Sequence, residues 1–241
     1  MAPIVNSENI ENRIEHQFDD AQTASETLAA LVATQLADAL LERDTASLVV
    51  SGGKSPIPFF AALRVLPLDW SRVWITLADE RWVDPSSADS NERLLREHLL
   101  RDAAATAHFV PLKSAFATAE AGLATSSTAL AAILRPFDVV VLGMGEDGHT
   151  ASLFPGASGL PAALLMDDPA ELAAITPLTA PHQRISLRLP ALLDSRCIHL
   201  PLSGTSKLAV YRRALAENDP LQWPIAAVLH QAKVPVNIWL S

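Results

Sequence analysis

Short apolar runs alternate with helix-like segments along the chain, and this alternation limits the fold more than any other feature of the sequence. The runs expected to form strands are residues 47–51, 72–78, 137–142, 197–202, 226–229 and 236–240. The segments expected to form helices are residues 23–43, a stretch beginning at 55, 90–100, 118–134 and 205–216. Strands that alternate with helices are joined by right-handed crossovers, which makes neighbouring strands parallel. We therefore predict an α/β fold, with a doubly wound, mostly parallel sheet flanked by helices, formed by residues 1–241 as a single domain.

Local signals mark where two of the helices begin and where the regular pattern stops. Thr23 and Glu26 have the spacing of a capping box, and Pro56 stands at the first position of the second helix. The stretch 155–190 is rich in proline and is expected to be rich in loops. Long loops in such a fold often carry function.

The composition excludes several kinds of protein. A chain with 49% apolar and 19% charged residues is not intrinsically disordered. Its net charge of −9 argues against nucleic-acid binding, although a local cluster of cations can still bind an anionic ligand. The single cysteine, Cys197, allows no internal disulfide, and the histidines lack metal-ligand spacing, so we expect no metal site.

No membrane segment or targeting signal is apparent. Residues 148–166 form the longest stretch without charge, but glycines and prolines interrupt it, so it cannot be a spanning helix. Residues 1–12 are polar and acidic and lack the apolar stretch of a secretory signal. We expect a cytoplasmic monomer.

Polar or glycine-rich segments follow four of the predicted strands. In an open α/β sheet, ligands bind at the carboxyl ends of the strands. These segments should therefore converge at one edge of the sheet. They are residues 51–56, 79–81, 143–150 and 203–207.

The first of these segments, Ser-Gly-Gly-Lys-Ser-Pro, predicts a phosphate-binding turn. Its glycines let backbone N–H groups face a ligand, a helix begins just after it, and Lys54 adds a full positive charge. A nucleotide-binding P-loop is excluded because Leu48 stands where that motif needs glycine. The alternative is an ordinary turn from strand to helix. The candidate phosphate ligands are Gly52, Gly53, Lys54 and Ser55.

The third segment contains Gly143, Gly145 and Gly148 in the pattern of a dinucleotide-binding fingerprint. That fingerprint must open a long helix, whereas Pro155 and Gly156 end any helix here within one or two turns. No dinucleotide cofactor is therefore expected.

His149 is the strongest candidate for a catalytic group. It follows a predicted strand within a glycine-rich turn, and its neighbour Asp147 can orient it and stabilise its charged form. A histidine titrates near neutral pH, which suits general acid and base catalysis. Arg81, also after a strand, could bind a phosphate or stabilise an oxyanion. Arg184 and Lys207 could add phosphate-binding charge; each could equally be a surface cation.

Taken together, these segments resemble a known family. Residues 143–156, Gly-Met-Gly-Glu-Asp-Gly-His-Thr-Ala-Ser-Leu-Phe-Pro-Gly, look like the signature of the 6-phosphogluconolactonases. The order and spacing of four further segments are similar to those of the same family. These segments are residues 51–53, 79–83 with 90–91, 184–190 and 204–207.

The resemblance implies hydrolysis of 6-phospho-D-glucono-1,5-lactone to 6-phospho-D-gluconate, the second step of the oxidative pentose phosphate pathway, without a metal or cofactor. It implies that His149 activates water, that Asp147 orients His149 or binds a sugar hydroxyl, and that Arg81 stabilises the carbonyl oxygen or grips the phosphate. The residues implied in substrate binding are Gly52, Gly53, Lys54, Ser55, Asp79, Arg184 and Lys207.

Two other functions compete with this one: an aldose–ketose isomerase or deaminase on the same fold, and a non-catalytic sugar-phosphate sensor. The related glucosamine-6-phosphate deaminases are expected to carry a catalytic glutamate where this chain has Phe154, and a tyrosine-type residue where it has Arg81. A non-catalytic sugar-phosphate sensor would need a DNA-binding module, and residues 1–20 are too short and too acidic to form one. Release of ammonia from glucosamine 6-phosphate would identify a deaminase.

Overall fold

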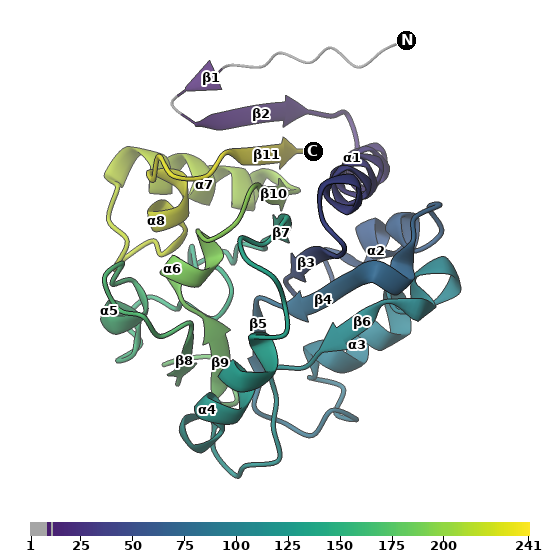
Figure 1. Cartoon of the computed structure of the whole chain (residues 1–241). Coiled ribbons are helices and arrows are strands. Elements are labelled where there is room, and N and C mark those ends of the chain that lie inside the picture. The colour runs from purple at the N-terminus through teal and green to yellow at the C-terminus, as the bar shows by residue number, and fades with distance from the viewer. Residues whose placement is uncertain (1–8, 11) are drawn as a thin grey trace.

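A computed structural model describes residues 9–10 and 12–241. Its main feature is a sheet of eight strands, all parallel except β1, which pairs antiparallel with β2 at one edge (Figure 1). The strand order is β1 (Asn9–Ile10), β2 (Arg13–Gln17), β11 (Val236–Leu240), β10 (Ile198–Leu202), β7 (Val139–Val141), β3 (Ala46–Val50), β4 (Val73–Leu77) and β6 (His108–Val110). The predicted α/β fold with a mostly parallel sheet is confirmed.

Helices cover both faces of this sheet. The α-helices are α1 (Ala21–Glu42), α2 (Ile57–Leu63), α3 (Asn91–His98), α4 (Ala119–Leu130), α5 (Leu160–Ala163), α6 (Leu189–Leu192), α7 (Thr205–Glu217) and α8 (Ile225–Leu229). The connection from β3 through α2 to β4 runs in the opposite direction across the sheet to that from β10 through α7 to β11. Because both crossovers are right-handed, α2 and α7 lie on opposite faces, as Figure 1 shows. None of the described helices is both long enough and apolar enough to cross a membrane.

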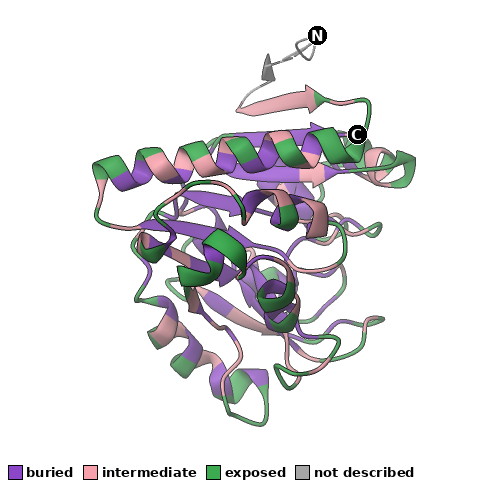
Figure 2. Cartoon of the chain, turned by 90° about the vertical axis from the view of Figure 1, so that its right-hand side faces the viewer, coloured by how far each residue is buried: buried purple, intermediate pink, exposed green. Residues whose placement is uncertain are grey.

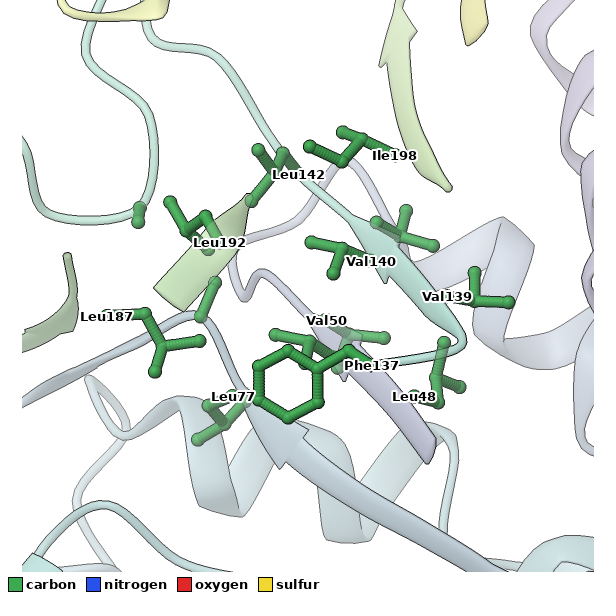
Figure 3. Close-up of a cluster of buried hydrophobic side chains, with 14 of the residues drawn as sticks. Leu48, Val50, Leu77, Phe137, Val139, Val140, Leu142, Leu187, Leu192 and Ile198 are labelled. Carbon is green, nitrogen blue, oxygen red and sulfur yellow. The ribbon is translucent and has the colours of Figure 1, made fainter. Parts of the chain in front are cut away.

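The central strands form the core. All residues of β3, β7 and β11 are buried, as expected for strands with helices on both sides (Figure 2). Figure 3 shows Leu48 and Val50 of β3, Leu77 of β4 and Leu187 from a second sheet in one apolar cluster. The large sheet and the second sheet therefore share a core.

The second sheet is small and antiparallel, with the order β5 (Asp79–Arg81), β9 (Arg184–Leu187) and β8 (Leu172–Ile175). Ala78 joins it to the large sheet, because its N–H donates to the carbonyl of Val50 at 2.8 Å and its own carbonyl accepts from the N–H of Leu187 at 2.8 Å. The chain therefore passes from the carboxyl end of β4 directly into β5.

The stretch 155–190 is rich in loops, as predicted, but it also contains the short elements α5, β8 and β9, which the sequence did not predict. Strands β8 and β9 are four residues each, and β9 pairs with β5, which lies about a hundred residues earlier in the chain. Such short strands depend on a distant partner more than on a local pattern. The expected strand at 226–229 is wrong: Pro224, with a φ of −56°, starts helix α8 there. Four apolar residues alone do not distinguish a strand from a helix.

Three local details also differ from the sequence prediction or go beyond it. Asp20, rather than Thr23, caps α1, since its carboxylate accepts from the N–H of Thr23 at 2.8 Å. Strand β2 was not predicted, because its sequence is mostly polar and it lies near the sheet edge. The predicted apolar face of α2 is confirmed, with Phe59, Phe60 and Leu63 buried.

Candidate active site

A cavity of about 170 Å³ opens where the parallel strands end. This is smaller than the roughly 300–1,000 Å³ of pockets for drug-sized ligands. The space therefore suits a monosaccharide better than a dinucleotide. Each of the four polar segments contributes to its wall, among them Gly52, Arg81, His149 and Lys207.

His149 and Asp147 form a hydrogen-bonded pair at this cavity. The imidazole Nδ1 lies 2.5 Å from Oδ1 of Asp147, and the two side chains are 30% and 44% exposed. A carboxylate can only accept, so Nδ1 carries the proton and a neutral His149 keeps a lone pair on Nε2. Burial alone would raise the pKa of Asp147, but the hydrogen bond and charge of His149 outweigh burial and hold this pKa below its usual value. The pair can therefore accept and return a proton.

The turn that carries His149 leaves it little freedom. Gly148 has a φ of +76°, in the left-handed region that favours glycine. The N–H of Gly145 donates to the carbonyl of His149 at 2.9 Å. A Cβ added to Gly145 would lie 2.2 Å from the imidazole ring, so only glycine fits beside His149. The glycines read as a dinucleotide fingerprint in the sequence thus shape the turn around the histidine.

Phe154 covers one face of the imidazole. The two ring centroids are 4.2 Å apart, with 27° between the planes. The same phenylalanine ring also lies near Arg184, whose guanidinium carbon is 5.9 Å from the ring centroid. Phe154 thus connects the candidate base to a candidate anion-binding group.

The small sheet directs charged side chains toward the site. Alternation along β5 puts Asp79 and Arg81 on one face and Glu80 on the other. The register places Asp79 opposite Ser186 and Arg81 opposite Arg184, so these four side chains share a face. Two like charges directly opposite each other are unfavourable unless an anion lies nearby. The small sheet therefore places two positive charges side by side next to the cavity.

The two arginines have no acidic partner among the described residues, since no ion pair within 4.0 Å includes Arg81 or Arg184. The Nε atoms of both arginines are buried, and neither has a hydrogen-bond partner among the residues that the structure describes. Burial, and then the charge of Arg81, lower the pKa of Arg184, although an arginine stays charged at neutral pH. A substrate anion would relieve this repulsion.

Glu80 was not identified as a site residue from the sequence. It lies on the opposite face of β5 from Asp79 and Arg81 and binds the start of α3. Its buried carboxylate accepts from the backbone N–H groups of Asn91, Glu92 and Arg81 at 2.7–2.8 Å and from the hydroxyl of Ser90 at 3.2 Å. Burial raises the pKa of Glu80, against the effect of these hydrogen bonds. Glu80 thus fixes the start of α3 against β5, where Asn91 reaches the cavity.

The glycine turn lies against Asn91. A Cβ on Gly52 would be 2.0 Å from Oδ1 of Asn91, and Gly53 has a φ of +89°. Across the turn, the ammonium of Lys207 lies 3.3 Å from the hydroxyl of Ser55. Lys54 is exposed and does not line the cavity, unlike the other candidates from this turn.

The remaining candidates are placed as follows. Asp79 is buried at the cavity wall, and its Oδ2 accepts from the hydroxyl of Ser152 at 2.5 Å. Arg184 is only 5% exposed and lies beside Arg81 rather than on the wall itself. Sequence reasoning missed Asn91 and Ser152, although Asn91 follows a helix-capping serine within a segment already singled out. No group of three potential metal-ligating His, Cys, Asp or Glu side chains gathers anywhere in residues 9–10 and 12–241.

Comparison with known proteins agrees with this geometry. The family model for glucosamine-6-phosphate isomerases/6-phosphogluconolactonase matches residues 19–238. A 6-phosphogluconolactonase of Pseudomonas aeruginosa is 47% identical over 214 residues, which is 88% of this chain and 87% of the relative. The 6-phosphogluconolactonase of Pseudomonas putida is 44% identical over 224 residues, covering 93% and 91%. The crystal structure of a 6-phosphogluconolactonase from Shewanella baltica matches with a TM-score of 0.92 and 49% identity, covering 94% of this chain and 97% of that one. The chain therefore belongs to the glucosamine-6-phosphate isomerase/6-phosphogluconolactonase family.

Proposed function

We propose that this protein is a 6-phosphogluconolactonase, which hydrolyses 6-phospho-D-glucono-1,5-lactone to 6-phospho-D-gluconate in the pentose phosphate pathway. The names of its relatives support this activity at 44–47% identity over most of the chain. The single observation that carries the mechanism is the 2.5 Å contact between His149 and Asp147 at a cavity that also holds Arg81 and Lys207.

His149 is the proposed general base. Its Nε2 takes a proton from a water molecule as the water oxygen attacks the lactone carbonyl carbon. The resulting tetrahedral oxyanion collapses, the bond from this carbon to the ring oxygen breaks, and His149 returns its proton to that oxygen. Asp147 holds Nδ1 and stabilises the imidazolium between the two transfers. A positioned acid or base of this kind contributes about 10²–10⁴-fold to the rate.

The cationic groups stabilise the negative charge of the substrate and of the oxyanion. Lys207 and the glycine turn at Gly52, Gly53 and Ser55 provide one group of donors for phosphate. Arg81 and Arg184 provide a second group, for the phosphate or for the oxyanion formed at the carbonyl. Lys54, exposed beside the turn, contributes long-range positive charge.

Asp79 is proposed to position the sugar. Its Oδ2 is held by Ser152, so the other carboxylate oxygen is available to accept from a sugar hydroxyl at the cavity wall. The lactone carbonyl is reactive enough that this set of groups needs no metal or cofactor. The proposal includes a cytoplasmic monomer without nucleic-acid or membrane partners, and a single domain over residues 1–241.

The test is hydrolysis of the lactone, generated in situ and followed by NMR against its spontaneous rate, for wild type and His149→Ala. Wild type should hydrolyse the lactone rapidly, and His149→Ala should lose about 10²-fold or more in kcat. A wild-type rate equal to background would contradict the proposed activity. Ammonia release from glucosamine 6-phosphate would then identify the deaminase. A loss of kcat below about threefold in His149→Ala, less than 1 kcal/mol of barrier, would reject His149 as the base.

A further inference from the structure

Two loops leave the small sheet at the same end. Residues 82–90 follow β5, and residues 176–183 precede β9. Because β5 and β9 are antiparallel with Arg81 opposite Arg184, the loops begin side by side. The N–H of Trp82 donates to the carbonyl of Gln183 at 2.7 Å, which continues the pairing by one step.

Each loop gives a backbone carbonyl to one of the two site arginines. Nη1 of Arg81 donates to the carbonyl of Asp89 at 2.6 Å. Nη2 of Arg184 donates to the carbonyl of Pro181 at 3.0 Å. A guanidinium is a rigid planar fork, so one fixed nitrogen largely determines where its other N–H groups point.

The side chains of the same two loop regions meet. Nε2 of His182 lies 3.0 Å from Oδ2 of Asp89. Asp89 is the residue whose carbonyl holds Arg81, and His182 directly follows Pro181, whose carbonyl holds Arg184. We call this contact the Asp89–His182 clasp. It connects the two carbonyls that orient the two arginines.

His182 has a φ of +69°, in the left-handed region that residues other than glycine rarely adopt. Such conformations persist where the surrounding structure holds them, and they are common at functional sites. The clasp side chains are 35% and 59% exposed, and a surface pair of this kind contributes little to global stability. A role in stability alone therefore accounts poorly for the strained backbone.

We propose that the Asp89–His182 clasp is a positioning device. It fixes the orientation of the guanidinium groups of Arg81 and Arg184, so that both can bind the anionic part of the substrate. This inference rests on the proposed function for the identity of that substrate. Asp89 and His182 act through the arginines, so their removal weakens binding more than it slows the chemical step at His149.

A purely electrostatic role for Asp89 predicts the opposite result. Its negative charge favours the charged form of Arg184 and raises the pKa of this guanidinium. If Asp89 acted only as a nearby negative charge, its removal would strengthen the binding of an anion. If it acts as half of the clasp, its removal disorders the arginines and weakens binding. The sign of the change therefore distinguishes the two roles.

The test measures binding of 6-phosphogluconate and of inorganic phosphate by calorimetry, together with KM and kcat for the lactone. The variants are Asp89→Ala, His182→Asn and their combination. Asparagine tolerates a left-handed backbone but is too short to reach Asp89, so His182→Asn removes the contact without adding strain. His182→Gln, which keeps a hydrogen-bonding group of greater reach, is the conservative variant. Glu42→Ala is the control, because it breaks an exposed ion pair with Arg196 away from the cavity.

We expect Asp89→Ala and His182→Asn each to weaken binding of both anions and raise KM by about three- to tenfold, with kcat within about twofold of wild type. The double variant should match either single variant, and His182→Gln should recover part of the affinity. Tighter binding in Asp89→Ala, additive effects in the double variant, or a loss confined to kcat would overturn the clasp. Because calorimetry needs no turnover, the clasp is tested even if the wild type fails to hydrolyse the lactone.

Discussion

The ring of Phe154 stacks on the imidazole of His149, with the centroids 4.2 Å apart. Asp147 holds the same imidazole at Nδ1. The histidine is thus fixed at one edge by a hydrogen bond and on one face by an aromatic ring. A general base must be held in a productive geometry, and errors of about 1 Å can cost 100-fold in rate.

Phe154→Leu should reduce kcat while changing KM much less. Leucine keeps an apolar side chain but loses the flat surface against His149, and we expect kcat to fall about three- to tenfold, which is 0.7–1.4 kcal/mol of barrier. Phe154→Tyr should retain most of the activity. Steady-state kinetics and a thermal melt of each variant separate the effect on His149 from a loss of fold.

The control for this prediction is Phe116→Leu, since Phe116 is 48% exposed and does not line the cavity. Its kcat should equal that of wild type. Full activity in Phe154→Leu would show that Asp147 alone orients the imidazole.

Asp147→Asn should lower kcat by about 10- to 1,000-fold, because the amide cannot balance the charge that His149 gains during catalysis. Glu146→Gln is the matched control. Glu146 is the neighbouring acid, but its carboxylate accepts from Ser206 at 2.9 Å instead of from His149. Measured kcat values that fall equally in both variants would point to the local negative charge rather than to the contact with His149.

The sequence was sufficient to predict the parts of the site that follow parallel strands. Gly143 to Gly156 carry a signature whose family resemblance is confirmed, and the strand before them places His149 at the carboxyl edge of the sheet. The relation between Arg81 and Arg184 could not be predicted in this way. It depends on an antiparallel pair formed by residues about a hundred positions apart, for which neither strand has a strong local signal.

Glu80 illustrates a second limit of the sequence. In the segment Asp79-Glu80-Arg81, three adjacent charges read equally as a solvated loop or as a site. The side chains of these three residues alternate between the two faces of β5. Asp79 and Arg81 therefore face the cavity, whereas Glu80 faces the start of α3. The charge pattern therefore identifies residues 79–81 as a candidate site segment, but the face on which each side chain lies follows only from the pairing of β5 with β9.

Gly145→Ala should abolish most activity, because the added methyl group would lie 2.2 Å from the His149 ring and must displace it. Gly143→Ala, two residues earlier in the same turn, is the control: its Cβ would meet only Ser51, at 3.7 Å. We expect kcat to fall at least about 100-fold in Gly145→Ala, as for loss of the base, and about twofold or less in Gly143→Ala. Equal activity in the two variants would contradict the placement of His149.

His199 provides a test of stability that is separate from catalysis. It is fully buried, and both ring nitrogens are used: Nε2 donates to Oε1 of Gln35 at 2.8 Å, and Nδ1 accepts from the indole N–H of Trp239 at 3.1 Å. A proton on Nδ1 would break the bond to Trp239. Burial, aided by the charge of His16, lowers the pKa of His199 to about 3.

This lowered pKa makes stability depend on pH. The unfolded chain protonates His199 below about pH 6.5, whereas the folded protein keeps it neutral down to about pH 3, so acid favours unfolding across this window. The stability that His199 contributes is complete above about pH 6.5 and declines by about 1.4 kcal/mol for each pH unit below it. His199→Gln removes this titration, so the difference in unfolding free energy between wild type and variant should narrow from pH 7 to pH 5. Urea unfolding followed by tryptophan fluorescence measures the unfolding free energy of each protein, and the exposed His230→Gln is the control for replacing a histidine by glutamine. A constant difference for His199→Gln would mean that the folded protein also protonates His199 in this range.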